Sequence, residues 1–505
     1  STNHLETTVL NLTTKSGSGS TFVTETDSVT VTNLSLTVER VKSDGSLDAS
    51  KPSSSQEDLT SGSDLVLVAT NGSITVNGGT ATATVGVSAT DDILLYSGET
   101  GADNATTADI TLNASVTSTG GNISLIAKDS ITQTATVGDI TVTTSGKTID
   151  LKADDAITMG DGALTQSNDG NIRYEATAGN ITLGELSTGA AGTTTGKIAV
   201  TATAGSILDL GVDTSAVDIT AADLILTAGT AIGQSTNHLE TTVLNLTTKS
   251  GSGSTFVTET DSVTVTNLSL TVERVKSDGS LDASKPSSSQ EDLTSGSDLV
   301  LVATNGSITV NGGTATATVG VSATDDILLY SGETGADNAT TADITLNASV
   351  TSTGGNISLI AKDSITQTAT VGDITVTTSG KTIDLKADDA ITMGDGALTQ
   401  SNDGNIRYEA TAGNITLGEL STGAAGTTTG KIAVTATAGS ILDLGVDTSS
   451  VDITAADLIL TAGTAIGQST NHLETTVLNL TTKSGSGSTF VTETDSVTVT
   501  NLSLT

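Results

Sequence analysis

Short stretches in which aliphatic and polar residues alternate recur along the whole chain. The clearest is 222–232, Ala-Asp-Leu-Ile-Leu-Thr-Ala-Gly-Thr-Ala-Ile, and similar phrases begin at Gly121, Gly170 and Gly196. Each phrase has a small residue, then usually Asp or Asn, then two aliphatic residues separated by one position, then Ala and a turn. Alternation over about five positions predicts a β-strand with one buried face. Helical spacing is nowhere convincing, so the sequence predicts an all-β fold.

The predicted strands recur at a nearly constant step. The first aliphatic residue of the phrase falls at Ile172, Ile198 and Leu224, in steps of 26 residues. Weaker strands follow eight or nine residues later, at Ile131, Ile157, Ile181, Ile207 and Ile232, and a third, less regular set contains Ile140, Leu164 and Val217. About three short strands per coil, repeated coil after coil, are typical of a parallel β-helix, or β-solenoid. We expect each Ile to lie above the Ile of the coil before.

A string of β-sandwich domains is the rival architecture, because strands every ~8–12 residues also suit sandwiches. The strands of a sandwich need not resemble one another. Here they do, at a fixed step, and this favours the solenoid.

The sequence also has a repeat that is much longer than one coil. Residues 1–271 and 235–505 align without a gap and differ only where Ala216 stands against Ser450, so the period is 234 residues. We interpret 1–234 as a first repeat, 235–468 as a second, near-identical repeat, and 469–505 as the start of a third, in a window of a longer chain. At ~24 residues per coil and ~4.8 Å between strands, one repeat is expected to be ~47 Å long, in a solenoid that continues across repeats.

Polar stretches interrupt the strand rhythm in each repeat. Residues 43–63, and 277–297 in the second repeat, are rich in Ser and contain the only Pro of each repeat. They are predicted to be protruding loops, whereas Leu34 to Val38, just before the first of them, is expected to belong to the solenoid. A second polar excursion covers 97–107. Such loops often bind ligands, although a polar segment of this composition can also be an inert connection between two coils.

Composition and charge narrow the function classes. Aromatic residues make up 1% of the chain, so the interior is expected to be a narrow stack of small branched side chains, and there is no Cys. The net charge is −38, or −18 per full repeat, which disfavours nucleic acid and anionic membrane surfaces as partners. No apolar run approaches the ~18 residues of a membrane span. The acidic surface is expected to keep the chain soluble and to resist lateral aggregation.

Four acidic residues gather within a short segment, Asp154, Asp155, Asp161 and Asp169. Turn oxygens at this density are candidate ligands for Ca²⁺, which accepts irregular oxygen shells. The calcium nonapeptide of repeat-in-toxin proteins and the EF-hand loop are both absent, and Asp also stabilises turns by bonding its own backbone. The turn role is therefore the default, no cofactor is required, and calcium is the one candidate.

We do not expect this chain to be an enzyme. The same acids, beside Lys152 and Arg173, suggest the sites of β-helical polysaccharide lyases and glycosidases. Nothing in their spacing singles out a catalytic pair, so a carbohydrate-active β-helix enzyme is a remote alternative. His4, the sole histidine of its repeat, has no second ligand or nucleophile nearby in sequence and is interpreted as a surface loop residue.

The phrase at 222–233, the segment 237–243 that follows it, and the Gly-Asn-Ile-x-Leu units resemble the repeat regions of filamentous-haemagglutinin-like bacterial exoproteins. The resemblance implies a right-handed parallel β-helix that is secreted to the bacterial cell surface. We expect a structural, fibre-forming extracellular rod that gives length and multivalent display, with neighbouring copies of itself as partners. The alternative is an adhesin that binds a host, neighbour-cell or glycan ligand through its loops.

Overall fold

The structure is a computed structural model that describes residues 3–78, 84–101, 107–190, 192–211, 217–312, 319–335, 341–369, 371–445 and 450–504. The chain forms two compact units. Unit 1 comprises Ser1–Gly229 and Ser269–Ser289, and unit 2 comprises Thr230–Leu268 and Gln290–Thr505. Unit 1 therefore includes a segment that lies, in sequence, between the two parts of unit 2.

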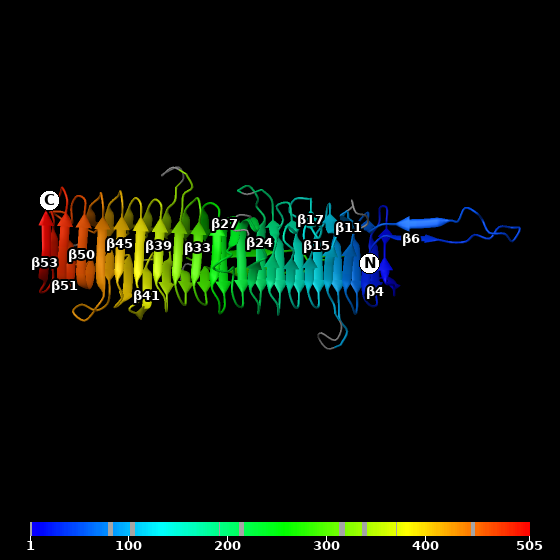
Figure 1. Ribbon diagram of the computed structural model, residues 1–505, viewed down its shortest axis with the longest axis horizontal. Helices are drawn as coiled ribbons and strands as arrows, with labels where there is room; N and C mark the ends of the chain where they lie inside the picture. Colours follow the sequence, from blue (N-terminus) through cyan, green and yellow to red (C-terminus); the bar gives the residue numbers. More distant parts are fainter. Residues whose placement is uncertain are drawn as a thin grey trace. The chain divides into compact units, whose positions relative to one another are not determined.

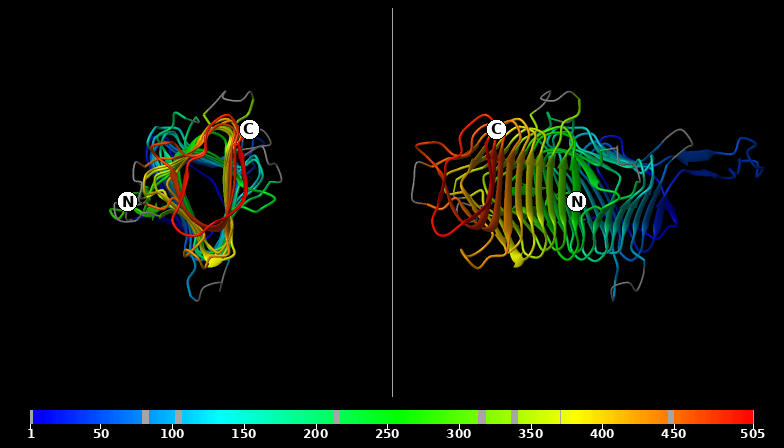
Figure 2. Two further views of the ribbon diagram at one scale, coloured as in Figure 1. Left: turned by 90° about the vertical axis from the view of Figure 1, so that its left-hand side faces the viewer. Right: turned by 60° about the vertical axis from the view of Figure 1, so that its left-hand side comes forward.

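Unit 1 is a parallel β-helix with three sheets, in which each coil contributes one strand to each sheet (Figures 1 and 2). The first sheet contains β1 (Leu5–Thr7), β4 (Thr21–Glu25), β9 (Leu65–Ala69), β12 (Ile93–Ser97), β15 (Ile123–Ala127), β18 (Ile149–Ala153), β21 (Ile172–Ala176) and β24 (Lys197–Ala202). The second contains β2 (Asn11–Leu12), β5 (Val29–Val31), β10 (Ile74–Asn77), β13 (Ile110–Asn113), β16 (Ile131–Gln133), β19 (Ile157–Met159), β22 (Ile181–Leu183) and β25 (Ile207–Asp209). The third contains β3 (Thr14–Lys15), β8 (Leu59–Ser61), β11 (Val85–Ala89), β14 (Ser115–Ser118), β17 (Ile140–Val142), β20 (Leu164–Gln166) and β23 (Glu185–Ser187). The long strand β26 (Ile219–Ala228) pairs with both the first and the third sheet.

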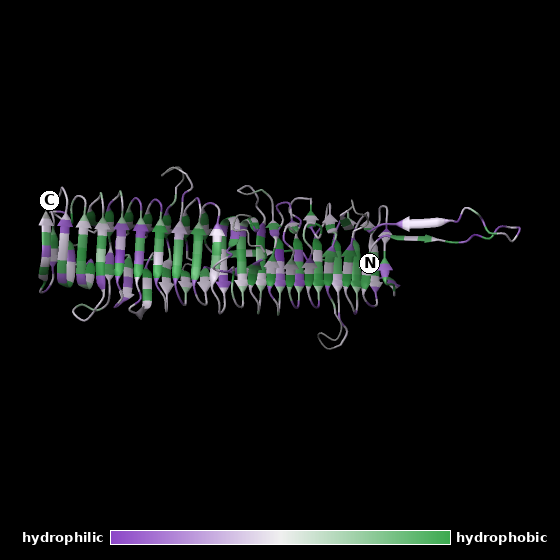
Figure 3. Cartoon of the chain, viewed as in Figure 1, coloured by the Kyte–Doolittle hydropathy of each residue, from purple (hydrophilic) through white to green (hydrophobic). Residues whose placement is uncertain are grey.

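The core of unit 1 consists of ladders of aliphatic side chains, and the prediction of a parallel β-helix is confirmed. Ile123, Ile149, Ile172 and Ile198 pair in register in the first sheet and are fully buried. The second sheet stacks its Ile residues in the same way, at Ile110, Ile131, Ile157, Ile181 and Ile207. Hydrophobic bands consequently repeat from strand to strand in each unit (Figure 3). A parallel ladder places equivalent residues of successive coils on top of each other, which is why the step in the sequence reports the register.

The third sheet differs from the expected ladder by one residue. Ile140 pairs with Thr165 and not with Leu164, so a hydroxyl points into the core. Thr165 Oγ1 lies 2.6 Å from the hydroxyl of the fully buried Tyr174, which donates to Gln133 Oε1 at 2.6 Å. A buried phenol needs a hydrogen-bond partner, and Thr165 and Gln133 supply it. Burial also raises the pKa of Tyr174.

The Asp and Asn residues that precede the strands hold successive coils together. Asn122 Oδ1 accepts the backbone N–H of Thr148 at 2.9 Å, and Asn180 Oδ1 accepts that of Ser206 at 2.8 Å. Asn171 Oδ1 does the same for the N–H of Lys197 at 3.0 Å. A side-chain oxygen at this position satisfies a backbone donor of the next coil, which explains why the phrase favours Asp or Asn there.

A hairpin leaves the wall of unit 1 between β5 and β8. Strands β6 (Leu34–Thr37) and β7 (Ser53–Gln56) pair antiparallel and extend beyond the coils in Figure 1. The protruding segment is thus 34–56, and Leu59–Ser61 is back in the third sheet as β8, within the predicted loop 43–63. The alternating residues from Leu34 onward form a hairpin strand and not part of the solenoid wall. Of the excursion at 97–107, residues 102–106 lie outside the described part of the chain.

Unit 2 repeats the same architecture. Its first sheet contains β28 (Thr255–Glu259), β33 (Leu299–Ala303), β36 (Ile327–Ser331), β39 (Ile357–Ala361), β42 (Ile383–Ala387), β45 (Ile406–Ala410), β48 (Lys431–Ala436) and β50 (Ile453–Ala462). The second contains β29 (Val263–Val265), β34 (Ile308–Val310), β37 (Ile344–Leu346), β40 (Ile365–Gln367), β43 (Ile391–Met393), β46 (Ile415–Leu417) and β49 (Ile441–Asp443), and the third contains β32 (Leu293–Ser295), β35 (Val319–Ala323), β38 (Ser349–Ser352), β41 (Ile374–Ser379), β44 (Leu398–Asn402) and β47 (Glu419–Ser421). Long strands β27 (Leu239–Ser250) and β51 (Leu473–Ser484) pair along its first and last coils, with β52 (Val491–Glu493) and β53 (Thr498–Leu504) after them. The equivalents of β6 and β7 are β30 (Leu268–Thr271) and β31 (Ser287–Gln290).

Candidate functional site

One row of side chains on the outer surface of the first sheet of unit 1 is buried. Val66, Leu94, Ser124, Asp150 and Arg173 follow one another in register on β9, β12, β15, β18 and β21. Their exposed fractions are 0%, 2%, 0%, 0% and 7%. Outward-facing residues of a β-helix ordinarily meet solvent, so the burial of this row shows that something covers it.

The cover is the segment 269–289, which crosses the strands of the sheet. Every second residue of its first part makes a hydrogen bond to the coil beneath. Asn171 Nδ2 donates to the carbonyl of Thr271 at 2.8 Å, Glu273 N donates to Thr148 Oγ1 at 2.9 Å, and Val275 N donates to Ser124 Oγ at 2.9 Å. The segment is therefore anchored to successive coils. Although 277–297 was predicted as a protruding loop, its residues up to 289 belong to this packed segment of unit 1.

An apolar contact lies at the centre of the covered row. Val275, 1% exposed, packs against Val66 and Leu94. Partly buried hydrophobic residues surround this contact, Phe22, Val68, Tyr96 and Ile126. Burying a valine side chain stabilises a contact by about 1.5–3 kcal/mol relative to leaving it exposed. The docked segment thus has a hydrophobic anchor.

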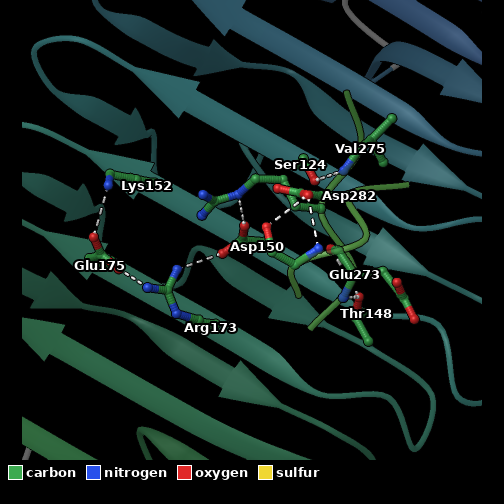
Figure 4. Close-up of polar contacts among 11 residues, drawn as sticks. Ser124, Thr148, Asp150, Lys152, Arg173, Glu175, Glu273, Val275 and Asp282 are labelled. Atoms are coloured by element: carbon green, nitrogen blue, oxygen red, sulfur yellow. Dashed lines mark hydrogen bonds and ion pairs between the residues drawn. The ribbon is translucent and has the colours of Figure 1, made fainter. Parts of the chain in front are cut away.

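Next to this anchor lies a cluster of charged side chains (Figure 4). The fully buried carboxylate of Asp150 accepts from Arg274 Nε at 2.7 Å and from Arg173 Nη1 at 3.0 Å. Arg173 also pairs with Glu175, which in turn pairs with Lys152 at 3.1 Å. Each of these two ion pairs offsets part of the free-energy cost of removing the Asp150 carboxylate from water. Arg274 therefore ties the segment to the sheet.

The far end of the segment meets the first coil. His4 Nε2 lies 2.9 Å from the carbonyl oxygen of Ser277, and His4 Nδ1 lies 2.7 Å from Thr24 Oγ1. A carbonyl only accepts, so Nε2 carries the proton in this contact. An added Cβ at Gly279, whose φ is +80°, would lie 3.0 Å from the ring of Phe22. His4, interpreted from sequence as a surface loop residue, thus helps to hold the docked segment.

The equivalent row in unit 2 is open. Val300, Leu328, Ser358, Asp384 and Arg407 are in the same register, 234 positions further along. The Arg407 and Asp384 side chains still pair at 2.8 Å, but they are 47% and 37% exposed, against 8% and 0% for Arg173 and Asp150. A hollow of about 470 Å³ lies there, lined by Phe256, Asp298, Val300, Asp326, Ile327, Leu328, Asn356, Ser358 and Ile360.

The four candidate calcium ligands are spread over turns of unit 1. Asp154 pairs with Lys128 at 2.8 Å, Asp169 accepts the N–H of Thr195, and Asp161 borders a hollow with Asp209 and other acidic residues. Asp155 lies beside Asp154 in the turn before β19, where its N–H donates to the carbonyl of Asp129 at 3.0 Å. Asp154 and Asp169 have structural partners here, and calcium at these positions stays a prediction.

A different set of acids comes together in unit 2. Carboxylate oxygens of Asp443, Asp452 and Glu474 lie within 4.8 Å of one another, and Asp452 and Glu474 are buried. Asp452 Oδ2 accepts the N–H of Glu474 at 2.8 Å, and Asp443 Oδ2 accepts from Asn471 at 2.7 Å. Three carboxylates at this spacing could hold a divalent cation. They come from different coils, so no local motif in the sequence indicates them.

The fold places this chain in the class of parallel β-helix proteins. Within the described residues, no helix has the length and apolarity needed to span a membrane. Comparisons with models of known families, with characterised proteins and with solved structures find no match.

Proposed function

We propose that this chain is a structural, fibre-forming rod of a repetitive bacterial surface protein, which gives length and regular display outside the cell. One observation carries the proposal: the segment 269–289, from the second repeat of the sequence, packs into unit 1. Consecutive repeats are in this way fastened by side-chain contacts in addition to the peptide bond. Such fastening suits a protein that transmits load and keeps its length.

The stacking of the coils supports the same proposal. Each unit buries its aliphatic ladders only by placing one coil on the next, so each further coil covers an open edge and extends the β-helix. The haemagglutinin-like resemblance of the phrases agrees with a secreted, cell-surface location.

Chains with one, two and three copies of the 234-residue repeat test the proposal. If the repeats stack as one rod, each added copy lengthens single particles by ~47 Å, since stacked strands are ~4.8 Å apart. Electron microscopy of single chains at low concentration measures the length. Particles whose length does not grow with copy number, or that look like separate beads, would contradict the rod.

Adhesion is the second candidate. The hairpin β6–β7 of unit 1 exposes apolar side chains, with Val41 68% and Leu47 56% exposed. Exposed apolar residues on a projecting element are typical of a binding surface. Adhesion predicts saturable binding to cells or glycans that is lost when residues 39–49 are replaced by a Gly-Ser linker.

A further inference from the structure

We propose that Asp443, Asp452, Glu474 and Asn471 bind one Ca²⁺ ion between two successive coils of unit 2. The three carboxylates and the amide would supply oxygen ligands from this chain. Such an ion would fasten one coil to the next, whether or not the chain forms a fibre.

The four residues come from both sides of one contact between coils. Asp443 ends β49 and Asp452 directly precedes β50, whereas Glu474 lies in β51, which pairs in parallel with β50 (Figure 1). The backbone N–H of Asp452 donates to the carbonyl of Glu474 at 2.8 Å, and Glu474 N donates to Asp452 Oδ2 at 2.8 Å. Asn471 lies two residues before β51 and contacts Asp443. The sheet therefore holds these side chains together before any ion binds.

The spacing of the carboxylates suits Ca²⁺. Oxygens of Asp443, Asp452 and Glu474 lie within 4.8 Å of one another. Ca²⁺ binds oxygen at ~2.3–2.6 Å, so two oxygens on the same ion are at most ~5.2 Å apart. Mg²⁺ binds at ~2.0–2.1 Å, which lowers this limit to ~4.2 Å, and it requires a nearly ideal octahedron. Ligands that are all oxygen also favour these hard cations over zinc or copper.

A buried amide oxygen beside the carboxylates is a second, independent indication of an ion. Asn471 is 9% exposed, and its Oδ1 has no hydrogen-bond partner among the residues that the structure describes. Asn471 Nδ2 donates to Asp443 Oδ2 at 2.7 Å. The nitrogen and oxygen of one amide are ~2.3 Å apart, so Asn471 Oδ1 lies within about 5 Å of that carboxylate. A buried oxygen without a donor is unfavourable, and a cation would satisfy it.

The amide of Asn471 is also fixed in place by the chain around it. Its Nδ2 contacts the carbonyl oxygen of Asp443 at 3.3 Å and that of Gly445, in addition to the Asp443 carboxylate. An amide nitrogen has only two hydrogens to offer to these three oxygens. The nitrogen is thus committed to the turn after β49, which leaves Oδ1 as the atom available to a ligand.

Charge at the site favours a cation as well. Asp452 and Glu474 are 5% and 4% exposed, and the carboxylate of Asp443 lies beside them. Buried like charges this close repel each other, and a divalent cation offsets that repulsion. Ca²⁺ takes about six to eight oxygen ligands, so backbone carbonyls or water would complete the shell.

Calcium titration of the whole chain tests the site. Glu474→Gln removes one charge and keeps the shape of the side chain. Glu291→Gln is the matched control, because Glu291 is exposed and precedes β32, among the first strands of unit 2. Isothermal titration calorimetry with CaCl₂, after removal of divalent ions with a chelator, counts the ions that each variant binds. We expect Glu474→Gln to bind one Ca²⁺ fewer per chain than Glu291→Gln, or to bind it at least tenfold more weakly, since affinity follows the number of charged ligands.

Asp443→Asn is a second variant of the same site, at a half-buried residue where a change disturbs the fold less. It should lose the same ion, and far-ultraviolet circular dichroism checks that both variants keep their strands. Equal numbers of ions and equal affinities in Glu474→Gln, Asp443→Asn and Glu291→Gln would overturn the proposal. Displacement of the ion by an equal concentration of Mg²⁺ would overturn the assignment to calcium.

Discussion

At the scale of the residue, the positions that depart from the small-aliphatic pattern of the core carry specific hydrogen-bond demands. Glu259 stands where most phrases have Ala, pairs in register with Ala303, and is fully buried. Its carboxyl accepts from Thr241 Oγ1 at 2.6 Å and from the N–H of Val243 at 3.1 Å. Sequence reasoning gave this acid no role, because a charged residue beside a turn is ordinarily exposed.

Burial raises the pKa of Glu259 from 4.5 to about 8, an increase that the hydrogen bonds from Thr241 and Val243 partly offset. Between these two values the folded chain holds a proton that the unfolded chain has released. The free energy of unfolding must therefore fall as the pH rises through this window.

We expect the melting temperature of unit 2 to fall between pH 5 and pH 8 in the wild type. The free energy of unfolding should decrease over this range by an amount on the order of a few kcal/mol. Glu259→Gln, which cannot ionise, should flatten this dependence. Circular dichroism melts at several pH values measure it, in a window where ordinary carboxylates are already charged. An unchanged slope in the variant would show that Glu259 is not responsible.

At the scale of the element, the two copies of the hairpin show how surroundings decide the state of one sequence. Both copies have the same turn, in which Asp44 and Asp278 accept from the hydroxyl and the N–H of Ser46 and Ser280. Those bonds lower the pKa of both carboxyls. One copy is exposed and the other is docked, so the local sequence specifies the hairpin but not its contact.

Asp150→Asn should release the docked hairpin, and Asp384→Asn is its matched control. Removing one partner of a buried ion pair costs about 3–5 kcal/mol, whereas an exposed pair contributes about 0–1 kcal/mol. Asp150 is fully buried and Asp384 is 37% exposed. We expect trypsin to cleave at Lys276 faster in Asp150→Asn than in the wild type, at a rate approaching that at Lys42 in the free hairpin.

The outcome is read by fragment mass, which separates cleavage at Lys42 from cleavage at Lys276. Equal cleavage of both variants would show that the Asp150 cluster does not hold the hairpin. Asp150→Asn and Asp384→Asn are matched variants, because β18 and β42 have the same sequence and differ only in what covers them.

At the scale of the whole molecule, the net charge of −38 opposes any contact between copies. Neighbouring copies in the proposed fibre must come together against this repulsion. At 0.1 M salt, repulsion between exposed charges that are more than a Debye length of ~10 Å apart is largely screened.

Raising NaCl from about 10 mM to about 150 mM should therefore increase the association of copies, by roughly tenfold or less. Sedimentation velocity at several chain concentrations measures the effect. Dissociation of the unmodified chain by salt would show that ion pairs, and not apolar burial, drive the contact.

The sequence determined the fold class and most of the register in advance. Steps of 26 residues between Ile172, Ile198 and Leu224 correspond to direct pairing in the first sheet. The prediction failed by one residue at Leu164, because Tyr174 requires a hydroxyl partner that a rule based on aliphatic positions does not include.

Only the tertiary structure decided which outer surface is a site. Each strand of a β-helix pairs with the strand one coil away. Because these pairs recur at a fixed step along the chain, the spacing of aliphatic residues in the sequence predicts them. The docking of Val275 on Val66 and Leu94 joins residues far apart in sequence, and no local pattern records it. For the same reason, the alternation of Leu34, Leu36 and Val38 was interpreted as another strand of the solenoid wall. Alternation predicts that a strand has an apolar face to bury, but only the folded chain shows which surface covers that face.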